Sequence, residues 1–431
     1  MTASPTTLAE LRTHKFLARR VDALTEALMS APDDAALWIG AGLSAKYAGL
    51  PTWTRFLRQL LESHVPWNSK DFALIASLMD SGRLAIAAEC LQDVVGPKVR
   101  VALISQMNGS SGRLPDEIAY LGVRDVITTN YDTVLESSLR GYQTLLPSSG
   151  LAKLLSNDFK IVKIHGTVSI PDSCVLSLSN YVRAYNVNLN WYLTSVFSTC
   201  NVAFLGCSMN ASEPYFDVLR ILRATGRMKG QHFAVVAVQS DEAAKDLGHR
   251  LKEFEIELIP YIADDQHTFL DELLVHFESH RGSSVTIRRR LEVVRSDLRT
   301  GRGFRAGLRL WHASHAQVTS SHDRQALADV VAEFFISTLG RGDHADHSLF
   351  VSQCGSAGVD LPQMMLRTLD LIGNSSRTVN AFRKLRSVFL ALEKAVGSKL
   401  PLLGRKLAEL GQEIAEAEKA RVEALKNTRS Q

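Results

Sequence analysis

Seven short apolar runs, separated by segments of helical character, constrain the fold of this chain more than any other feature. The runs are ALWIG at 36–40, RDVITTNYD at 124–132, YQTLL at 142–146, KIVKIHG at 160–166, NVAFLG at 201–206, HFAVVAV at 232–238 and IELIPY at 256–261. A strand covered on both faces carries apolar residues in succession, whereas a strand with one wet face alternates. With helical segments such as DEAAKDLGHRLKEF between them, the runs predict a parallel sheet buried on both faces.

The first run ends in a glycine turn. Residues 38–53 read WIGAGLSAKYAGLPTW, and the residues after Gly42 have the character of a helix start. Gly40 and Gly42 allow a sharp turn that brings the backbone close to a pyrophosphate, whose charge the helix dipole and exposed amides stabilise. Gly-x-Gly after a strand is also an ordinary tight turn. Within a parallel sheet, the turn predicts a Rossmann-like α/β fold that binds a dinucleotide.

The chain is long enough for more than one domain. Its 431 residues, 45% of them hydrophobic, allow each domain its own core. We expect helices in residues 1–35, a sheet domain over 36–282 with a helical insertion at about 54–117, and an all-helical C-terminal domain over 283–431. The helical stripes of this last part include residues 324–339, 363–372, 379–396 and 406–426.

Charge is distributed unevenly along the chain. Residues 286–431 carry 23 Lys and Arg against 15 Asp and Glu, whereas the preceding residues carry 26 against 30. The basic part is compatible with a nucleic-acid partner, with a subunit interface in a homo-oligomer, or with a solvated face. No apolar run approaches the length that spans a bilayer, and residues 1–30 lack the apolar region of a signal peptide, so we expect a cytoplasmic protein without membrane contact.

The cysteine and histidine patterns predict no metal site. The five cysteines include no C-x-x-C pair, so neither a structural zinc site nor a disulfide framework is expected. The histidines of DHADHS at 343–348 lie in a loop-like stretch, and we interpret them as a chance cluster.

Polar residues follow three of the predicted strands. Asn130 and Asp132 follow VIT, His165 follows IVKI, and Gly206 and Ser208 follow VAFL. Each has an ordinary alternative: Asn and Asp cap helices, a lone His is usually a surface or core residue, and Gly-x-Ser begins many turns. Because ligands of open parallel sheets bind outside the carboxyl ends of the strands, we expect these residues to converge on one crevice.

The motif order GAGLS…GLPTW, TTNYD, KIHG and a later Gly-x-Ser turn resembles the NAD-binding domain of the sirtuins over roughly residues 36–280. The chain departs from sirtuin deacylases in two respects. It lacks their zinc-binding Cys pairs, and Thr52-Trp53 follows Pro51 where they have Asp-Phe-Arg. It is more similar to the zinc-less sirtuin-like domains of bacterial antiphage defence proteins, which hydrolyse NAD+. Its short helical extension resembles that of the sirtuin-like partner of HerA-type ATPases.

The resemblance implies roles for individual residues. It implies that Asn130 and His165 are catalytic. An amide can orient a ribose hydroxyl or the attacking water, and an imidazole with an ordinary pKa near ~6.5 can accept a proton. We expect Asp132 to hold the ribose or the nicotinamide side of the pocket, if it does not only cap a helix. The expected binding residues are Gly40, Ala41, Gly42 and Ser44 for the pyrophosphate, Gly206 and Ser208 for the adenosine half, and Pro51 and Trp53 for the nicotinamide pocket.

Two functions of different class fit these residues. The first is a regulated NAD+ glycohydrolase that forms nicotinamide and ADP-ribose and depletes NAD+ during antiphage defence, with a homo-oligomer or a HerA-type ATPase as partner. The second is a non-catalytic module that senses NAD or ADP-ribose, or a nucleic-acid-associated subunit, and regulates a partner. The enzyme and the sensor both need the glycine turn to bind the dinucleotide, but only the enzyme requires a base beside the ribose. Asn130 and His165 together therefore favour the enzyme.

Overall fold

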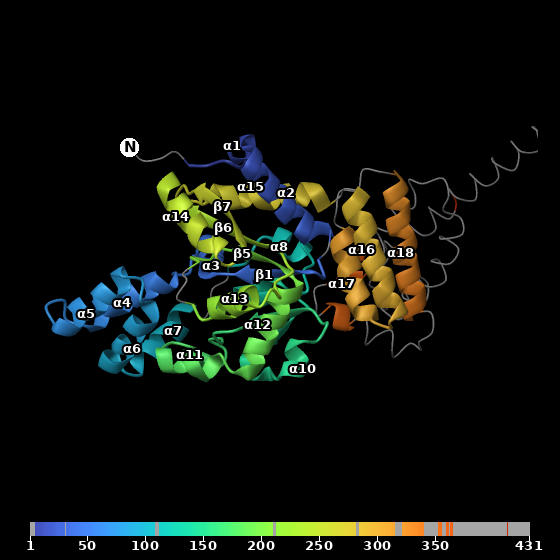
Figure 1. Ribbon diagram of the computed structural model, residues 1–431. Helices are drawn as coiled ribbons and strands as arrows, with labels where there is room; N and C mark the ends of the chain where they lie inside the picture. The colour runs from blue at the N-terminus through green and yellow to red at the C-terminus, as the bar shows by residue number, and fades with distance from the viewer. Residues whose placement is uncertain are drawn as a thin grey trace, which may run out of the picture. The chain divides into compact units, whose positions relative to one another are not determined.

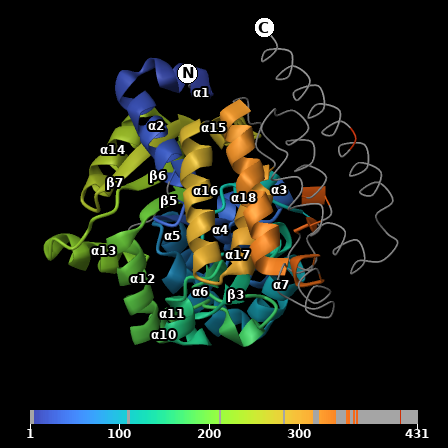
Figure 2. The same ribbon diagram turned by 90° about the vertical axis from the view of Figure 1, so that its right-hand side faces the viewer.

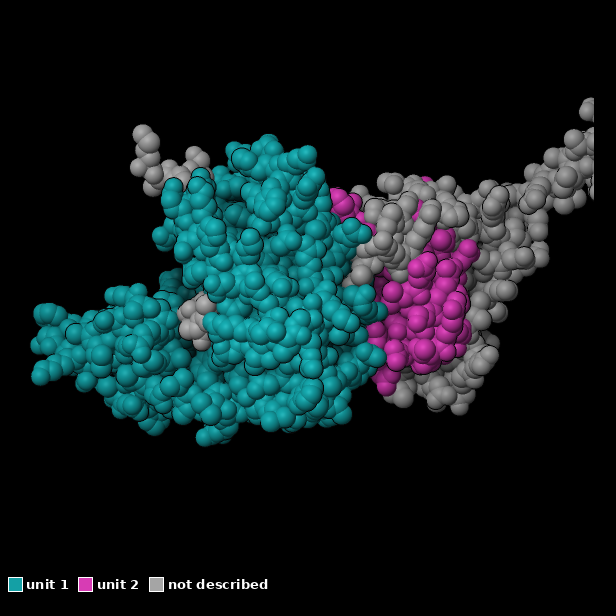
Figure 3. All heavy atoms as spheres, in the orientation of Figure 1, with its two compact units in different colours: residues 1–277 teal, residues 278–431 magenta. Residues whose placement is uncertain are grey.

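The structure is a computed structural model of the chain. It describes residues 5–30, 32–107, 112–209, 213–281, 284–314 and 321–339, with short stretches at 352–355, 359–361 and 363–364 and residue 412. The chain divides into two compact units, residues 1–277 and 278–431 (Figure 3). Each unit is described by itself below.

A seven-stranded parallel sheet forms the centre of the first unit. The strands are β1 (Ala35–Ile39), β2 (Asp125–Thr128), β3 (Gln143–Leu145), β4 (Lys160–Lys163), β5 (Asn201–Leu205), β6 (His232–Val238) and β7 (Ile256–Ile262). They lie in the order β3-β4-β2-β1-β5-β6-β7, so β2, β3 and β4 form one side of the sheet beside β1, with β3 at the edge, and the chain then crosses β1 to form the other side. This reversal beside β1 is the place where doubly wound sheets bind ligands. The predicted Rossmann-like α/β fold is confirmed.

Helices cover both faces of the sheet (Figure 1). On one face pack α1 (Leu8–Thr13), α2 (Lys15–Ser30), α8 (Asp116–Tyr120), α9 (Val134–Ser138) and α15 (Thr268–Arg281). On the other pack α10 (Leu151–Leu154), α12 (Val187–Thr199), α13 (Tyr215–Ala224) and α14 (Asp241–Lys252). The remaining short elements of this unit are α3 (Ala41–Ala48), α11 (Leu178–Ala184) and the 3-10 turns η1 (Pro147–Ser149) and η2 (Pro171–Ser173).

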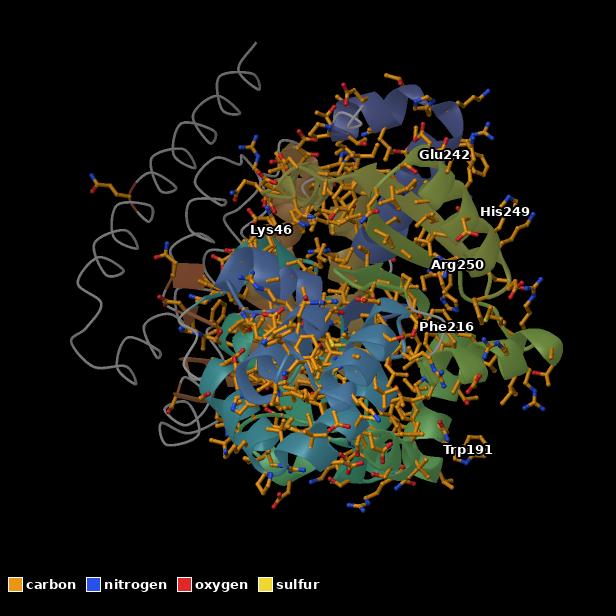
Figure 4. All side chains as sticks on the ribbon, turned by 90° about the vertical axis from the view of Figure 1, so that its left-hand side faces the viewer. Lys46, Trp191, Phe216, Glu242, His249 and Arg250 are labelled. Carbon is orange, nitrogen blue, oxygen red and sulfur yellow. The ribbon has the colours of Figure 1, made fainter. Side chains whose placement is uncertain are left out.

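The alternation of side chains along β1 explains the two apolar layers. Leu37 and Ile39 join the cluster beneath α2 and α15, whereas Ala36 and Trp38 join the cluster beneath α12 and α13. Successive residues of a strand point to opposite faces, so a strand with helices on both sides needs an unbroken apolar run. Polar side chains of the covering helices point away from the sheet, as Glu242, His249 and Arg250 of α14 do in Figure 4.

Four helices form the predicted insertion between β1 and β2. They are α4 (Trp53–His64), α5 (Lys70–Asp80), α6 (Leu84–Val95) and α7 (Lys98–Met107). Thr52 and Ser69 cap α4 and α5 by accepting a hydrogen bond from the backbone N–H three residues on. The insertion has its own apolar cluster, which Tyr131 and Val168 of the sheet loops join. The insertion is therefore attached at the carboxyl ends of β2 and β4.

The described elements of the second unit are helical. They comprise α16 (Ser284–Arg299), α17 (Gly303–Ser314) and α18 (Ser321–Leu339), which pack side by side (Figures 1 and 2). Asp297 of α16 is buried and pairs with Arg309 of α17 at 3.0 Å and with Arg305 at 3.5 Å. The predicted stripe at 324–339 lies within α18. The other predicted stripes, at 363–372, 379–396 and 406–426, fall almost entirely outside the described residues, as does the histidine cluster at 343–348.

Candidate functional site

A cavity of about 420 Å³ opens at the carboxyl ends of the strands, with α4, α6 and α7 of the insertion on one side. Its size is typical of a small-molecule site. Ten of the eleven predicted site residues line it: Gly40, Ala41, Gly42, Pro51, Trp53, Asn130, Asp132, His165, Gly206 and Ser208. Ser44 does not line the cavity, and its buried hydroxyl lies behind Asn130. Residues predicted separately from four stretches of sequence thus meet in one place.

The glycine turn after β1 interlocks with the end of β5. A Cβ on Gly40 would lie 2.4 Å from the carbonyl oxygen of Gly206, and one on Gly42 would lie 2.8 Å from it. Gly206 itself has a φ of +68°, which favours glycine. The N–H groups of Gly40 and Gly42 donate to the carbonyls of Leu205 and Gly206, both at 2.9 Å. These glycines therefore permit close backbone packing, and a pyrophosphate could receive their two N–H groups only by displacing those hydrogen bonds.

Asn130 is held by the buried residues on both sides of it. The Thr128 hydroxyl accepts from the Asn130 backbone N–H at 3.0 Å and donates to the carbonyl of Ile39 at 2.7 Å, which ties this loop to β1. The Asn130 side-chain Nδ2 donates to the hydroxyl of Ser44 at 3.1 Å. With Nδ2 so engaged, the buried Oδ1 of this cavity-lining residue has no hydrogen-bond partner among the described residues. Ser44 thus acts on the site through Asn130.

Asp132 has two structural contacts in addition to its place in the cavity wall. Its Oδ1 accepts from the backbone N–H of Val134 at 3.0 Å, so it does cap the start of α9. The buried ammonium of Lys163 donates to the Asp132 carbonyl and pairs with Glu136 at 3.0 Å. Asp132 therefore holds the start of α9 and also lines the cavity.

His165 differs from expectation in its surroundings. The sequence predicted an imidazole with an ordinary pKa, placed outside the core, but its ring is almost fully buried and burial lowers its pKa to about 3. Its Nε2 lies 3.1 Å from the hydroxyl of Tyr185, and its ring packs edge-on against Tyr181. The reason for the difference is tertiary: α11 and the following turn place both tyrosines over the end of β4. Near pH 7 this histidine is therefore neutral.

Glu213 lines the cavity and was not predicted. It lies in the loop between β5 and α13, five residues beyond Ser208, at a spacing that follows no motif. Its Oε2 is 3.9 Å from Nε2 of His165 and has no hydrogen-bond partner among the described residues. Burial raises its pKa to about 7. The only sequence signal was an acidic residue before a proline and a helix start, which is an ordinary pattern.

Aromatic residues form the wall beside the insertion. Trp53 stacks on Phe56 with ring centroids 5.5 Å apart, and it lies at the same distance from the ring of Tyr131. Tyr131 is buried, and its hydroxyl donates to the carbonyl of Val175. Trp53 therefore packs against the core of the insertion and also lines the cavity with Pro51.

The opposite end of the cavity is lined by residues from β6, β7 and α15. They are Val235, Val236, Ala237, Tyr261, His267 and Leu270. The hydroxyl of Tyr261 lies 2.9 Å from Nδ1 of His267, whose φ of +50° marks the turn before α15. Nearby, Lys46 of α3, labelled in Figure 4, pairs with Asp271 of α15 at 2.7 Å. A long ligand could thus extend from the His165 end across the glycine turn to this apolar end.

Part of the sheet domain is similar to a known family. Residues 124–259 match a family model described as a SIR2-like domain. This segment of the chain is similar to that family. The match begins at the residue before β2 and includes the loops that hold Asn130, His165 and Glu213, whereas the glycine turn precedes it. No protein among the curated sequences matches the chain. A SIR2-like domain implies NAD binding and an NAD-related function.

The described residues lack both a metal-binding cluster and a membrane-spanning helix. They contain no group of three or more His, Cys, Asp or Glu side chains placed to hold a metal ion. Among the helices that the structure describes, none is long and apolar enough to cross a membrane.

Proposed function

We propose that the protein is an NAD+ glycohydrolase, which adds water across the nicotinamide–ribose bond to form nicotinamide, ADP-ribose and a proton. One observation carries the proposal: Asn130 and His165, which follow two neighbouring strands within the residues that match a SIR2-like domain, line the same cavity as the glycine turn after β1. A binding module needs the turn, whereas bond cleavage also needs groups that orient water and take up its proton.

The role proposed for each residue follows from its contacts. Ser44 holds Nδ2 of Asn130 and leaves Oδ1 without a partner, so the amide can accept from a ribose hydroxyl or a water and orient it. His165, which burial keeps neutral near pH 7, has a ring nitrogen that can accept the proton which water loses. Pro51, Trp53 and Tyr131 supply an apolar wall for the departing nicotinamide ring.

The biological role is a proposal of the same kind. An unregulated glycohydrolase would exhaust the NAD+ of its own cell, so we propose a regulated effector of antiphage defence in the cytoplasm. A homo-oligomer or a HerA-type ATPase is the proposed partner that switches it on. None of the described residues of the helical unit lines the cavity, and this supports a function of that unit in assembly.

The test is NAD+ consumption by the purified chain, alone and with a candidate ATPase, with nicotinamide and ADP-ribose resolved as products. We expect His165→Ala to lower kcat by about 100-fold or more, which is typical for loss of a general base. Asn130→Ala should have a similar effect. The matched control is His249→Ala, which removes an exposed histidine from α14 and should leave turnover unchanged.

One observation favours the sensor as second candidate. A histidine with a pKa of about 3 is a weak base, as suits a module that binds without turnover. Dinucleotide binding with no product in any condition, including with the ATPase, would establish the sensor. Full activity of the His165→Ala variant would remove that residue from the mechanism.

A further inference from the structure

Two residues that line the cavity each carry a buried hydrogen-bond acceptor without a partner among the described residues. The acceptors are Oδ1 of Asn130 and Oε2 of Glu213. An unsatisfied buried acceptor has lost its water without gaining a donor, which typically destabilises a protein. Such atoms persist where a ligand brings the missing donors. The cavity thus calls for a ligand with at least two N–H or O–H groups at this end.

The contacts of Glu213 do not explain it as a structural residue. Within the described part of the chain, the ion pairs and hydrogen bonds place no lysine or arginine on its carboxylate, and its ion-pair contact there is with His165 at 3.9 Å. The α13 helix that follows it has no side-chain cap. A carboxylate on a packed loop, with neither a cation nor a cap to hold, is placed for something that enters the cavity.

The position of Glu213 indicates which part of a dinucleotide it meets. Its loop begins at Gly206, whose backbone packs directly against the glycine turn, so the carboxylate lies on the segment adjoining the expected pyrophosphate site. On its other side, the carboxylate lies beside His165, which packs against Tyr181. In NAD+, one ribose lies between the pyrophosphate and nicotinamide. Its two vicinal hydroxyls are donors of the kind that the acceptors of Asn130 and Glu213 lack.

We infer that Glu213 binds the hydroxyls of the ribose that carries nicotinamide and stabilises the positive charge which develops on that ribose as the bond breaks. The inference rests on the proposed glycohydrolase. A carboxylate in a cavity of low dielectric acts more strongly on a nearby charge than it would in water. The same negative charge also favours the protonated form of His165, so it makes that histidine a better proton acceptor.

The first experiment measures binding without turnover. Calorimetry would compare wild type and Glu213→Gln with two ligands, ADP-ribose, which has the second ribose, and ADP, which lacks it. We expect Glu213→Gln to weaken ADP-ribose binding about 10-fold, the usual effect of losing a hydrogen bond to a charged group, and to leave ADP binding within about 2-fold. Glu242→Gln, an exposed position on α14, is the matched control and should change neither.

The second experiment measures the reaction. Glu213→Gln should lower kcat about 100-fold while KM for NAD+ changes much less, because charge stabilisation acts mainly in the transition state. Glu213→Asp keeps the charge and should recover part of the rate. Thermal unfolding of each variant would show that the fold is kept.

The outcomes separate the inference from the proposed function. Wild-type affinity for ADP-ribose and wild-type turnover in Glu213→Gln would overturn the inference and leave the glycohydrolase standing. Equal weakening of ADP and ADP-ribose would also overturn it, because the effect would then be a general distortion of the cavity. If the wild type shows no turnover yet Glu213→Gln weakens ADP-ribose alone, the ribose contact stands and the proposed enzyme does not.

Discussion

At the scale of single residues, burial sets the properties of the site. His165 and Glu213 lie 3.9 Å apart, and the desolvation that lowers the pKa of the imidazole also raises the pKa of the carboxyl. Each group alone is therefore driven toward its neutral form. The two charged forms stabilise one another, so a proton moved to His165 is best accommodated when Glu213 is ionised. The residue type alone, read from the sequence, predicted an ordinary pKa for His165.

This environment predicts the pH dependence of turnover. The pKa of Glu213 is about 7, so the carboxyl is neutral below that pH and charged above it. Because the charged form stabilises the ribose cation, kcat/KM, which reports ionisations of the free protein, should rise through pH 7 and reach a plateau, with about a tenth of the plateau at pH 6. The histidine, with a pKa of about 3, does not titrate in this range.

The other groups around Glu213 leave this interpretation intact. The titratable groups that face it are His165, Tyr131, Tyr181, Tyr185, Cys207 and Tyr215. Burial raises the pKa of each tyrosine and of the cysteine well beyond neutrality, so they stay protonated. The rise should be absent from the pH profile of Glu213→Gln, and its persistence in that variant would assign it to another group.

At the scale of elements, the predicted strands are confirmed, and β6 has the predicted bounds, His232 to Val238. The apolar runs were informative because each strand is covered on both sides and has no wet face to interrupt the pattern. The glycine turn was predicted as a phosphate cradle, and its backbone contacts with the end of β5 could not be predicted. Those contacts join residues more than 160 positions apart, which no local pattern encodes.

The interlock predicts a stability difference between two glycines. Gly40→Ala would place a Cβ 2.4 Å from the carbonyl of Gly206, and the backbone shift should destabilise the fold by about 2 kcal/mol. Gly248 lies inside α14, where an added Cβ would meet only ordinary contact with a Leu258 methyl at 3.7 Å. Gly248→Ala should stabilise the protein by about 0.5–1 kcal/mol. Urea unfolding of both variants checks the sign, and equal effects would contradict the interlock.

At the scale of the whole molecule, the division into two units separates the cavity from the basic helical part. The three apolar clusters around the sheet and the insertion draw their residues from positions 8 to 277. The cavity is lined by residues 38 to 270. The N-terminal helices α1 and α2 belong to the same core, since Leu11, Leu24 and Leu28 pack with the sheet. The first unit thus contains a complete core and a complete cavity.

This completeness predicts the behaviour of a shortened chain. A chain that ends at residue 281, the last of α15, should unfold in one cooperative transition and bind ADP-ribose within about 3-fold of the full-length affinity. Calorimetry and thermal unfolding would test this. An aggregated fragment would show that the helical unit is needed for the fold, whereas a folded fragment that fails to bind would show that it is needed for the site.

The sequence by itself determined the α/β class, the approximate positions of the strands along the chain, and the loops from which the site is drawn, because burial on two faces and strand-end chemistry leave local patterns. Only the tertiary structure decided that Asn130 depends on Ser44, that the glycines pack against β5, and that His165 is buried beneath tyrosines. It also brought in Glu213, which no motif marks. Desolvation and the pairing of acceptors depend on which distant segments meet, and that is a property of the packed molecule.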